Sequence, residues 1–158
     1  MYTIVPLAYE EFKEAYQKSA VAKEAPLLER LASRLKLFPN AIKLWGVRRV
    51  SDRAIVAGIA VINSRAHKAS YYAHAFYLKE AAKDRPMIAL IDHWFLTSLE
   101  AGLQVLHFGS CLLAPELGAR RGYDISLFKA QFITGYYSYQ RPVYRFMRGK
   151  FYRTLPKR

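Results

Sequence analysis

The sequence predicts a mixed α/β domain of the α+β type, with a mostly antiparallel sheet, a central pair of parallel strands and flanking helices. Three observations support this fold class. Two helical stripes stand near the start, three strand-like segments follow in succession, and a further helix then separates two strand-like segments. At 158 residues the chain has room for one domain with a substantial core.

The first part of the chain predicts a short strand and two helices. The strand covers residues 2–5. The first helix opens at Glu10 and Glu11, because acidic residues favour the positive end of a helix dipole. The second helix opens at Pro26, a favourable first-turn residue, and ends before Pro39. Its apolar stripe consists of Leu27, Leu28, Leu31 and Leu35.

Three successive segments predict an antiparallel meander. They cover residues 41–50, 55–63 and 70–78, with short connections between them. The middle segment is apolar on both faces, which is typical of a central strand. Strict alternation in the third segment puts Tyr72, His74, Phe76 and Leu78 on one face and Tyr71, Ala73, Ala75 and Tyr77 on the other.

A third helix and another strand complete the predicted sheet. The helix starts at the sequence Asp84-Arg85-Pro86 and stops at Gly102, a residue favoured just past helix ends. A strand over residues 103–108 follows, and a crossover of this kind makes it parallel to the strand over 70–78. The stripe of the helix is Ile88, Ile91, Phe95 and Leu99, widened by Met87 and Trp94.

The last third predicts a helix over residues 126–134, capped by Ser126, and a strand over 140–146. We expect one domain over residues 1–147 and a basic C-terminal tail over 148–158.

The net charge of +13 is uneven. Residues 113–158 carry a net +8 and residues 1–112 a net +5. This indicates an anionic partner, such as a phosphate-bearing donor, RNA or a membrane surface, although a basic surface without a specific ligand fits equally. Cys111 is the sole cysteine, the start of the chain has no signal-peptide pattern, and no apolar run is long enough to span a membrane. We therefore expect a cytoplasmic protein without internal disulfides.

Three segments resemble the GNAT acyltransferases, and within them the FemAB/FemX group of aminoacyl-tRNA-dependent transferases. Residues 86–94 resemble the proline-initiated helix of that family, and residues 100–109 resemble its "A-x-x-G, then a strand, then Gly" segment. Leu127-Phe128-Lys129 with Phe132 resembles its Phe-Lys motif. The chain departs from the family in two respects. FemAB enzymes carry two such domains, and the glycine loop of CoA-binding members is absent between Leu78 and Arg85.

The resemblance implies that the two parallel strands splay apart and admit the acyl arm of a donor, held by backbone hydrogen bonds. It implies that Lys129 stabilises an oxyanion or a phosphate, where pattern alone indicates an ordinary lysine at the edge of a packed helix. The amide groups at the start of the helix at Pro86 form an anion site, which nearby cations strengthen. Candidate donor-binding residues are Lys79, Lys83, Arg85, Met87, Phe108, Phe128, Arg120 and Arg121.

Two residues are candidates for acid–base catalysis. Asp92 stands at the flank of an apolar stripe, and His74 stands in the middle of a strand. Each has an alternative structural interpretation, Asp92 as a local hydrogen-bonding group and His74 as a core histidine. The histidines show no metal-ligand spacing, so we expect no metal.

The sequence thus predicts an enzyme that moves an acyl or aminoacyl group from acyl-CoA or aminoacyl-tRNA to an unidentified amine, with no permanently bound cofactor. A homodimer would supply a second domain. The alternatives are a non-catalytic module that binds RNA through its basic, tyrosine-rich last third, and a module on an anionic membrane surface.

Overall fold

The computed structural model describes residues 1–19, 25–109, 128–129, 131–132, 143–147 and 150–154. The chain forms two compact units, Met1–Cys111 and Leu112–Arg158, which are described separately here. The predicted single domain over residues 1–147 stays a prediction.

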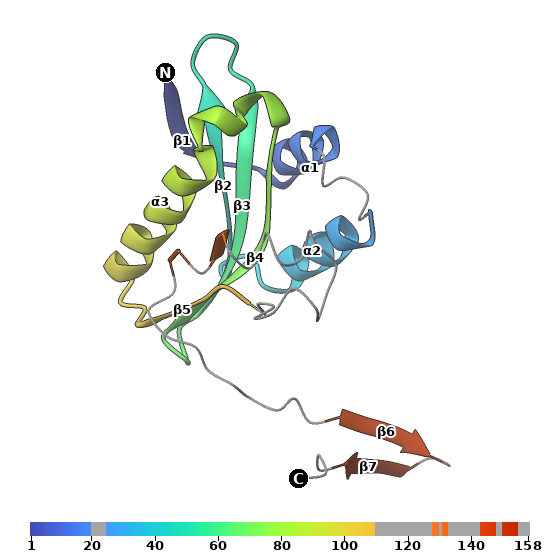
Figure 1. Ribbon diagram of the computed structural model, residues 1–158. Coiled ribbons are helices and arrows are strands. Elements are labelled where there is room, and N and C mark those ends of the chain that lie inside the picture. The colour runs from blue at the N-terminus through green and yellow to red at the C-terminus, as the bar shows by residue number, and fades with distance from the viewer. Residues whose placement is uncertain (20–24, 110–127, 130, 133–142, 148–149, 155–158) are drawn as a thin grey trace. The chain divides into compact units, whose positions relative to one another are not determined.

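The first unit is built on a five-stranded sheet with the strand order β1-β2-β3-β4-β5 (Figure 1). The first four strands pair antiparallel, and β5 pairs parallel with β4, as predicted. The elements are β1 (Tyr2–Pro6), α1 (Tyr9–Lys18), α2 (Ala25–Leu37), β2 (Ile42–Arg49), β3 (Ile55–Ser64), β4 (Ala69–Tyr77), the 3-10 helix η1 (Lys79–Asp84), α3 (Pro86–Glu100) and β5 (Val105–His107). The sequence analysis did not predict η1.

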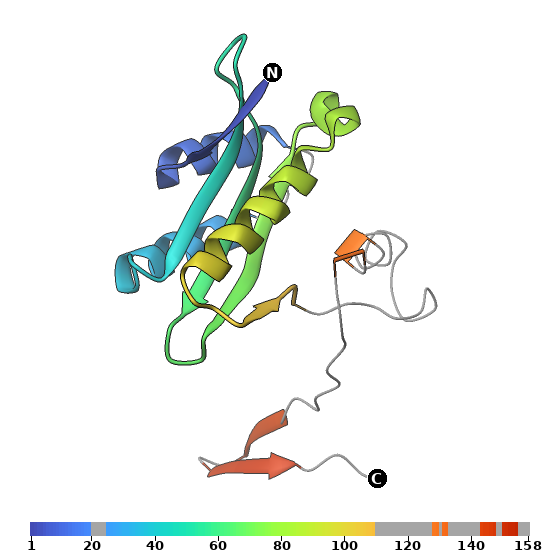
Figure 2. The same cartoon turned by 90° about the vertical axis from the view of Figure 1, so that its left-hand side faces the viewer.

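Helices cover both faces of this sheet: α1 and α2 lie on one face and α3 lies on the other (Figure 2). On the α1–α2 face, Phe12 and Tyr16 of α1 pack edge-on against Phe76 of β4, with ring centroids 5.2 and 5.9 Å away. All three rings are buried. These edge-to-face contacts add to the burial of the rings and hold α1 against the centre of the sheet.

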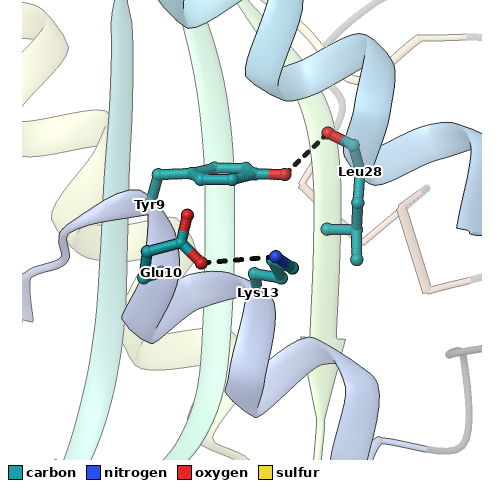
Figure 3. A network of polar contacts seen from close by, with 4 residues as sticks. All are labelled: Tyr9, Glu10, Lys13 and Leu28. Carbon is teal, nitrogen blue, oxygen red and sulfur yellow. Dashed lines mark hydrogen bonds and ion pairs between the residues drawn. The ribbon is translucent and has the colours of Figure 1, made fainter.

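A hydrogen bond joins the two helices of this face. The Tyr9 hydroxyl of α1 donates to the Leu28 carbonyl of α2 at 3.0 Å, and Lys13 pairs with Glu10 on α1 itself at 3.3 Å (Figure 3). A carbonyl in the first turns of a helix already accepts a helical bond, so the Tyr9 hydroxyl uses its second lone pair. The bond fixes the spacing of α1 and α2.

The buried face of α3 differs from the predicted stripe. Its buried side chains are Pro86, Met87, Leu90, Ile91, Trp94 and Ser98. Leu99, predicted to be part of the stripe, is 68% exposed. The reason is rotational: the wide apolar surface of α3 permits several stripes, and contact with the sheet selects the one centred on Trp94. Ile88 and Phe95 are half-buried at its flank.

The faces of β4 also differ from the prediction, because the strand contains a bulge. The register runs from Ala60 opposite His74 to Val61 opposite Tyr72, so Ala73 has no partner on β3. The extra residue reverses the alternation. His74 and Phe76 face α1 and α2, whereas Tyr72 faces α3 and packs on Trp94 at 6.0 Å. The strict alternation predicted for residues 70–78 is therefore wrong.

The second unit contains an antiparallel pair of strands, β6 (Val143–Met147) and β7 (Lys150–Thr154). β6 matches the predicted last strand, but β7 lies where only a tail was predicted. Of the predicted helix over residues 126–134 the structure describes one turn, in which the Phe132 amide donates to the Lys129 carbonyl at 3.0 Å and the rings of Phe128 and Phe132 lie 5.4 Å apart. The rest of that helix lies outside the described residues.

Candidate functional site

The strands β4 and β5 pair over three residues only. The pairs are Ala69 with Val105, Ser70 with Leu106, and Tyr71 with His107. Beyond Tyr71, β4 continues for six more residues to Tyr77, without further pairing to β5. Backbone groups on the edge of a strand are ready to pair with an incoming extended chain. The bulge at Ala73 lies where the pairing stops.

On the α3 side, aromatic rings surround the point where the pairing of β4 with β5 ends. Tyr72 stacks on Phe108, with ring centroids 5.8 Å apart, and Phe108 meets Trp94 edge-on at 5.1 Å. The Trp94 indole Nε1 donates to the Ser70 hydroxyl at 2.7 Å, and Ser70 donates to Asn63 Oδ1 at 2.6 Å. Trp94 and Ser70 are fully buried. These two hydrogen bonds hold the Trp94 ring against β3 and β4.

Burial raises the pKa of Tyr72 to about 12. The ionised phenolate would be costly among these rings, since little solvent reaches it. Tyr72 therefore keeps its proton at neutral pH, and its hydroxyl can donate a hydrogen bond. Tyr72 was predicted to share a face with His74, and the bulge at Ala73 puts it on the α3 side instead.

On the α2 side, His74 lies on the part of β4 that follows Tyr71 and makes no pairs with β5. Its side chain is half-buried and makes no hydrogen bond among the described residues. Burial lowers the pKa of His74 to about 4, and the positive charge of Arg34 on α2 lowers it further in the same direction. Both effects disfavour the imidazolium ion. At neutral pH His74 is thus an uncharged imidazole with an available ring nitrogen.

Two more aromatic side chains lie on the same face. Tyr71 and His107 stack almost parallel, with centroids 4.7 Å and ring planes 6° apart. Tyr71 stands opposite Ile62 in the sheet, and directly opposite residues share a face. Tyr71 is 37% exposed, so part of this stacked pair meets solvent.

The start of α3 lies just after the end of β4. The loop between them is η1, followed by Arg85 in the left-handed conformation at φ 50°, a conformation costly for a residue other than glycine. The Tyr2 hydroxyl of β1 donates to the Asp84 carboxylate at 2.5 Å and anchors this loop. Lys79, Lys83 and Arg85 are exposed here, next to the helix N-terminus, as the anion-site prediction requires.

The remaining predicted residues have different surroundings. Met87 is 7% exposed and packs in the core, and Asp92 is exposed on the outer part of α3. Phe128 and Lys129 are half-buried in the second unit, and Arg120 and Arg121 lie outside the described residues. The structure thus brings together His74 with Arg34, and Phe108 with Tyr72.

The described residues contain no group of three or more histidine, cysteine or acidic side chains placed to hold a metal ion. No helix among them is both long and apolar enough to cross a membrane.

Comparison with known proteins finds no matching family model and no matching curated protein, but it does find similar solved structures. An aminoglycoside acetyltransferase from an uncultured soil metagenomic sample is 12% identical, with a TM-score of 0.65 over 90% of this chain and 97% of that one. A GNAT family acetyltransferase from Staphylococcus aureus is 12% identical, with a TM-score of 0.56 over 90% of this chain and 98% of that one. This is the GNAT fold.

The fold predicted from the resemblance is therefore confirmed. A third structure with the GNAT fold is the ribosomal-protein-alanine N-acetyltransferase from Brucella melitensis, with 17% identity and a TM-score of 0.55 over 93% of this chain and 100% of that one. The matched proteins differ in the acceptors their names give. At these identities the GNAT fold is shared, and the substrate has to come from the site itself.

Proposed function

We propose that the chain is an acyltransferase that moves an acyl group from acyl-CoA to an amine. The observation that carries this proposal is the stretch of β4 beyond Tyr71 that makes no pairs with β5, next to His74, a half-buried and uncharged imidazole. The edge of β4 offers backbone groups to the amides of a donor arm. The solved structures of the same fold support the reaction class, since several are named acetyltransferases.

The reaction assigns one task to each group. The neutral acceptor amine attacks the thioester carbon with its nitrogen lone pair, and His74 accepts the proton that this nitrogen loses as the bond forms. The carbon–nitrogen bond forms, the carbon–sulfur bond breaks, and the thiolate leaves with a proton drawn from Tyr72 or from water. We propose Lys129 as the cation for the oxyanion or a phosphate, and Lys79, Lys83 and Arg85 with the start of α3 for the donor phosphates. In this scheme Asp92, exposed on α3, has no step.

Aminoacyl-tRNA is the second candidate donor. One observation favours it: the loop between β4 and α3 is a 3-10 helix without glycine, Lys79–Asp84, followed by a left-handed arginine. The net charge of +13 also suits a polyanion. With this donor an ester bond to the tRNA breaks in place of the thioester, and the same residues serve.

Both donors can be tested by thermal melting and by turnover. Acetyl-CoA in high excess should raise the melting temperature, and a mixture of amines should release free thiol. His74→Gln should lower kcat at least about a hundredfold without unfolding the protein. His67→Gln, at an exposed position, is the matched control and should keep full activity.

The same assay tests Lys129. Lys129→Ala should abolish turnover, while Lys43→Ala, an exposed lysine on β2, should not. A His74→Gln or Lys129→Ala variant with full activity would remove that residue from the proposal. If acetyl-CoA leaves the melting temperature unchanged and aminoacyl-tRNA raises it, the donor is the tRNA; if neither does, the acyltransferase proposal fails.

A further inference from the structure

An open hollow of about 300 Å³ lies on the α2 side of the sheet, next to the proposed site. Its lining comes from the end of α2, the start of β2 and the end of β3: Arg34, Phe38, Ala41, Ile42, Ile62, Asn63 and Ser64. The lining is mainly apolar, with one cation and no carboxylate. A volume near 300 Å³ is at the lower end for sites that hold small molecules.

Arg34 is the charged residue in the lining of this hollow. It is exposed, and no acidic side chain among the described residues pairs with it. On the neighbouring α1, Glu10 pairs with Lys13 and Glu11 pairs with Arg48. An arginine in this position can bind a carboxylate or phosphate with two parallel hydrogen bonds.

The hollow, the stacked aromatic pair and His74 follow one another along the same face. Ile62 lines the hollow and stands opposite Tyr71, whereas Ala60, two residues along β3, stands opposite His74. At about 3.4 Å per residue, His74 is roughly 7 Å along the strand from the hollow. A small molecule in the hollow can therefore place one end near Arg34 and the other near His74.

We infer that the acceptor is an amine with an apolar body and an anionic group: the anion pairs with Arg34, the body occupies the hollow beside Tyr71, and the amine reaches His74. This inference rests on the proposed acyl transfer, whose acceptor it specifies. A polycationic amine would need carboxylates to bind its other amino groups, and the hollow has none. Carboxylate and phosphate share the chemistry that Arg34 recognises.

Four acceptor probes test the inference, with acetyl-CoA as donor and thiol release as the readout. They are 4-(aminomethyl)benzoate, 4-(aminomethyl)phenylphosphonate, 4-methylbenzylamine and spermidine. We expect kcat/KM for at least one anionic probe to exceed that for 4-methylbenzylamine about tenfold, as a charge-assisted pair allows. The better anionic probe identifies carboxylate or phosphate as the group that is bound.

Variants at two positions of α2 test whether Arg34 is the residue that causes the preference for anionic probes. Arg34→Ala should remove the preference for the anionic probes over 4-methylbenzylamine, and Arg34→Lys should retain part of the preference. Lys36→Ala makes the same change of charge two residues away, at an exposed position, and should retain all of it. Equal use of charged and neutral probes, or a preference for spermidine, would overturn the inference while leaving acyl transfer established.

A binding experiment separates the inference from the reaction. Titration with 4-(aminomethyl)benzoate should shift the NMR signals of Ile62 and His74 in the natural protein and not in Arg34→Ala. Such shifts without any turnover would support the anion site and refute the proposed function. Turnover of other amines without these shifts would refute the anion site alone.

Discussion

Ser70 and Ser98 are both buried hydroxyls on the α3 side of the sheet, but only Ser70 has partners. It accepts from Trp94 and donates to Asn63, while the Ser98 hydroxyl has no hydrogen-bond partner among the described residues. Ser70→Ala should therefore lower the free energy of unfolding by about 1–3 kcal/mol, because the buried Trp94 N–H loses its acceptor. Ser98→Ala should be neutral or stabilising, since it removes a polar group without a partner.

Urea unfolding of the two variants measures this difference. A Ser98→Ala variant that loses as much stability as Ser70→Ala would show that the Ser98 hydroxyl has a partner after all. The indole near-ultraviolet signal should change in Ser70→Ala alone, because only that variant alters the surroundings of Trp94.

His74 makes stability depend on pH in a defined window. Its pKa is about 4 in the folded protein and about 6.5 in the unfolded chain, so between these values the unfolded state binds more protons. Stability therefore falls as the pH drops from about 6.5 to about 4, and this contribution is constant above about 6.5. His74→Asn should make the slope of unfolding free energy against pH shallower in that window. Equal slopes in His74→Asn and the natural protein would contradict the neutral imidazole.

At the scale of elements, a close approach at Gly58 governs how α1 fits the sheet. A Cβ at Gly58 would overlap the Phe76 ring and lie 3.2 Å from the Phe12 ring. Gly58→Ala should thus lower the free energy of unfolding by about 1–3 kcal/mol, as overpacking does. In a Phe76→Leu background the added methyl group has more room, and the cost of Gly58→Ala should shrink. A double-mutant cycle by urea unfolding measures this coupling, and strict additivity would contradict the contact.

The helices and strands also differ in how well they can be predicted from the sequence. The sequence correctly predicts the helices from Glu10 and Pro26, the meander, and the crossover at Pro86. Capping residues and periodic apolar positions are local signals of such elements. The bulge at Ala73 is not predicted, because it has no local signature such as a glycine. The exposed Leu99 shows the other limit, since contact with the sheet decides which stripe of an apolar helix is buried.

The candidate site is only partly predictable for the same reason. His74 was predicted as a candidate from its position in the middle of a strand, and Phe108 was among the predicted donor-binding residues. Arg34, Tyr71 and Tyr72 were missed, because they join the site through pairing between strands and through the packing of α2. Contacts between residues far apart in sequence have no single-sequence pattern.

At the scale of the whole molecule, the net charge of +13 and the sequence pI of about 10.0 predict attraction of an anionic donor from a distance. Raising the ionic strength from about 0.05 M to about 0.5 M should raise the KM for acetyl-CoA several-fold, because the screening length shrinks. Lys79→Ala with Lys83→Ala should reduce this salt dependence. The pair Lys36→Ala and Lys43→Ala removes two exposed lysines elsewhere and should reduce it less. Equal slopes for the two pairs would remove the loop before α3 from the donor site.

The unpaired Ala73 also governs how this chain should be aligned with other chains of the same fold. A gap placed anywhere else in β4 would match residues that face α3 with residues that face α2, so a phenol on one side would be compared with an imidazole on the other. At 11–17% identity to solved structures, sequence scoring alone does not locate that gap. Alignments that fix Tyr72 and His74, with one residue between them, would match residues of the α3 side only with residues of that side. The substitutions on each face of β4 could then be compared separately.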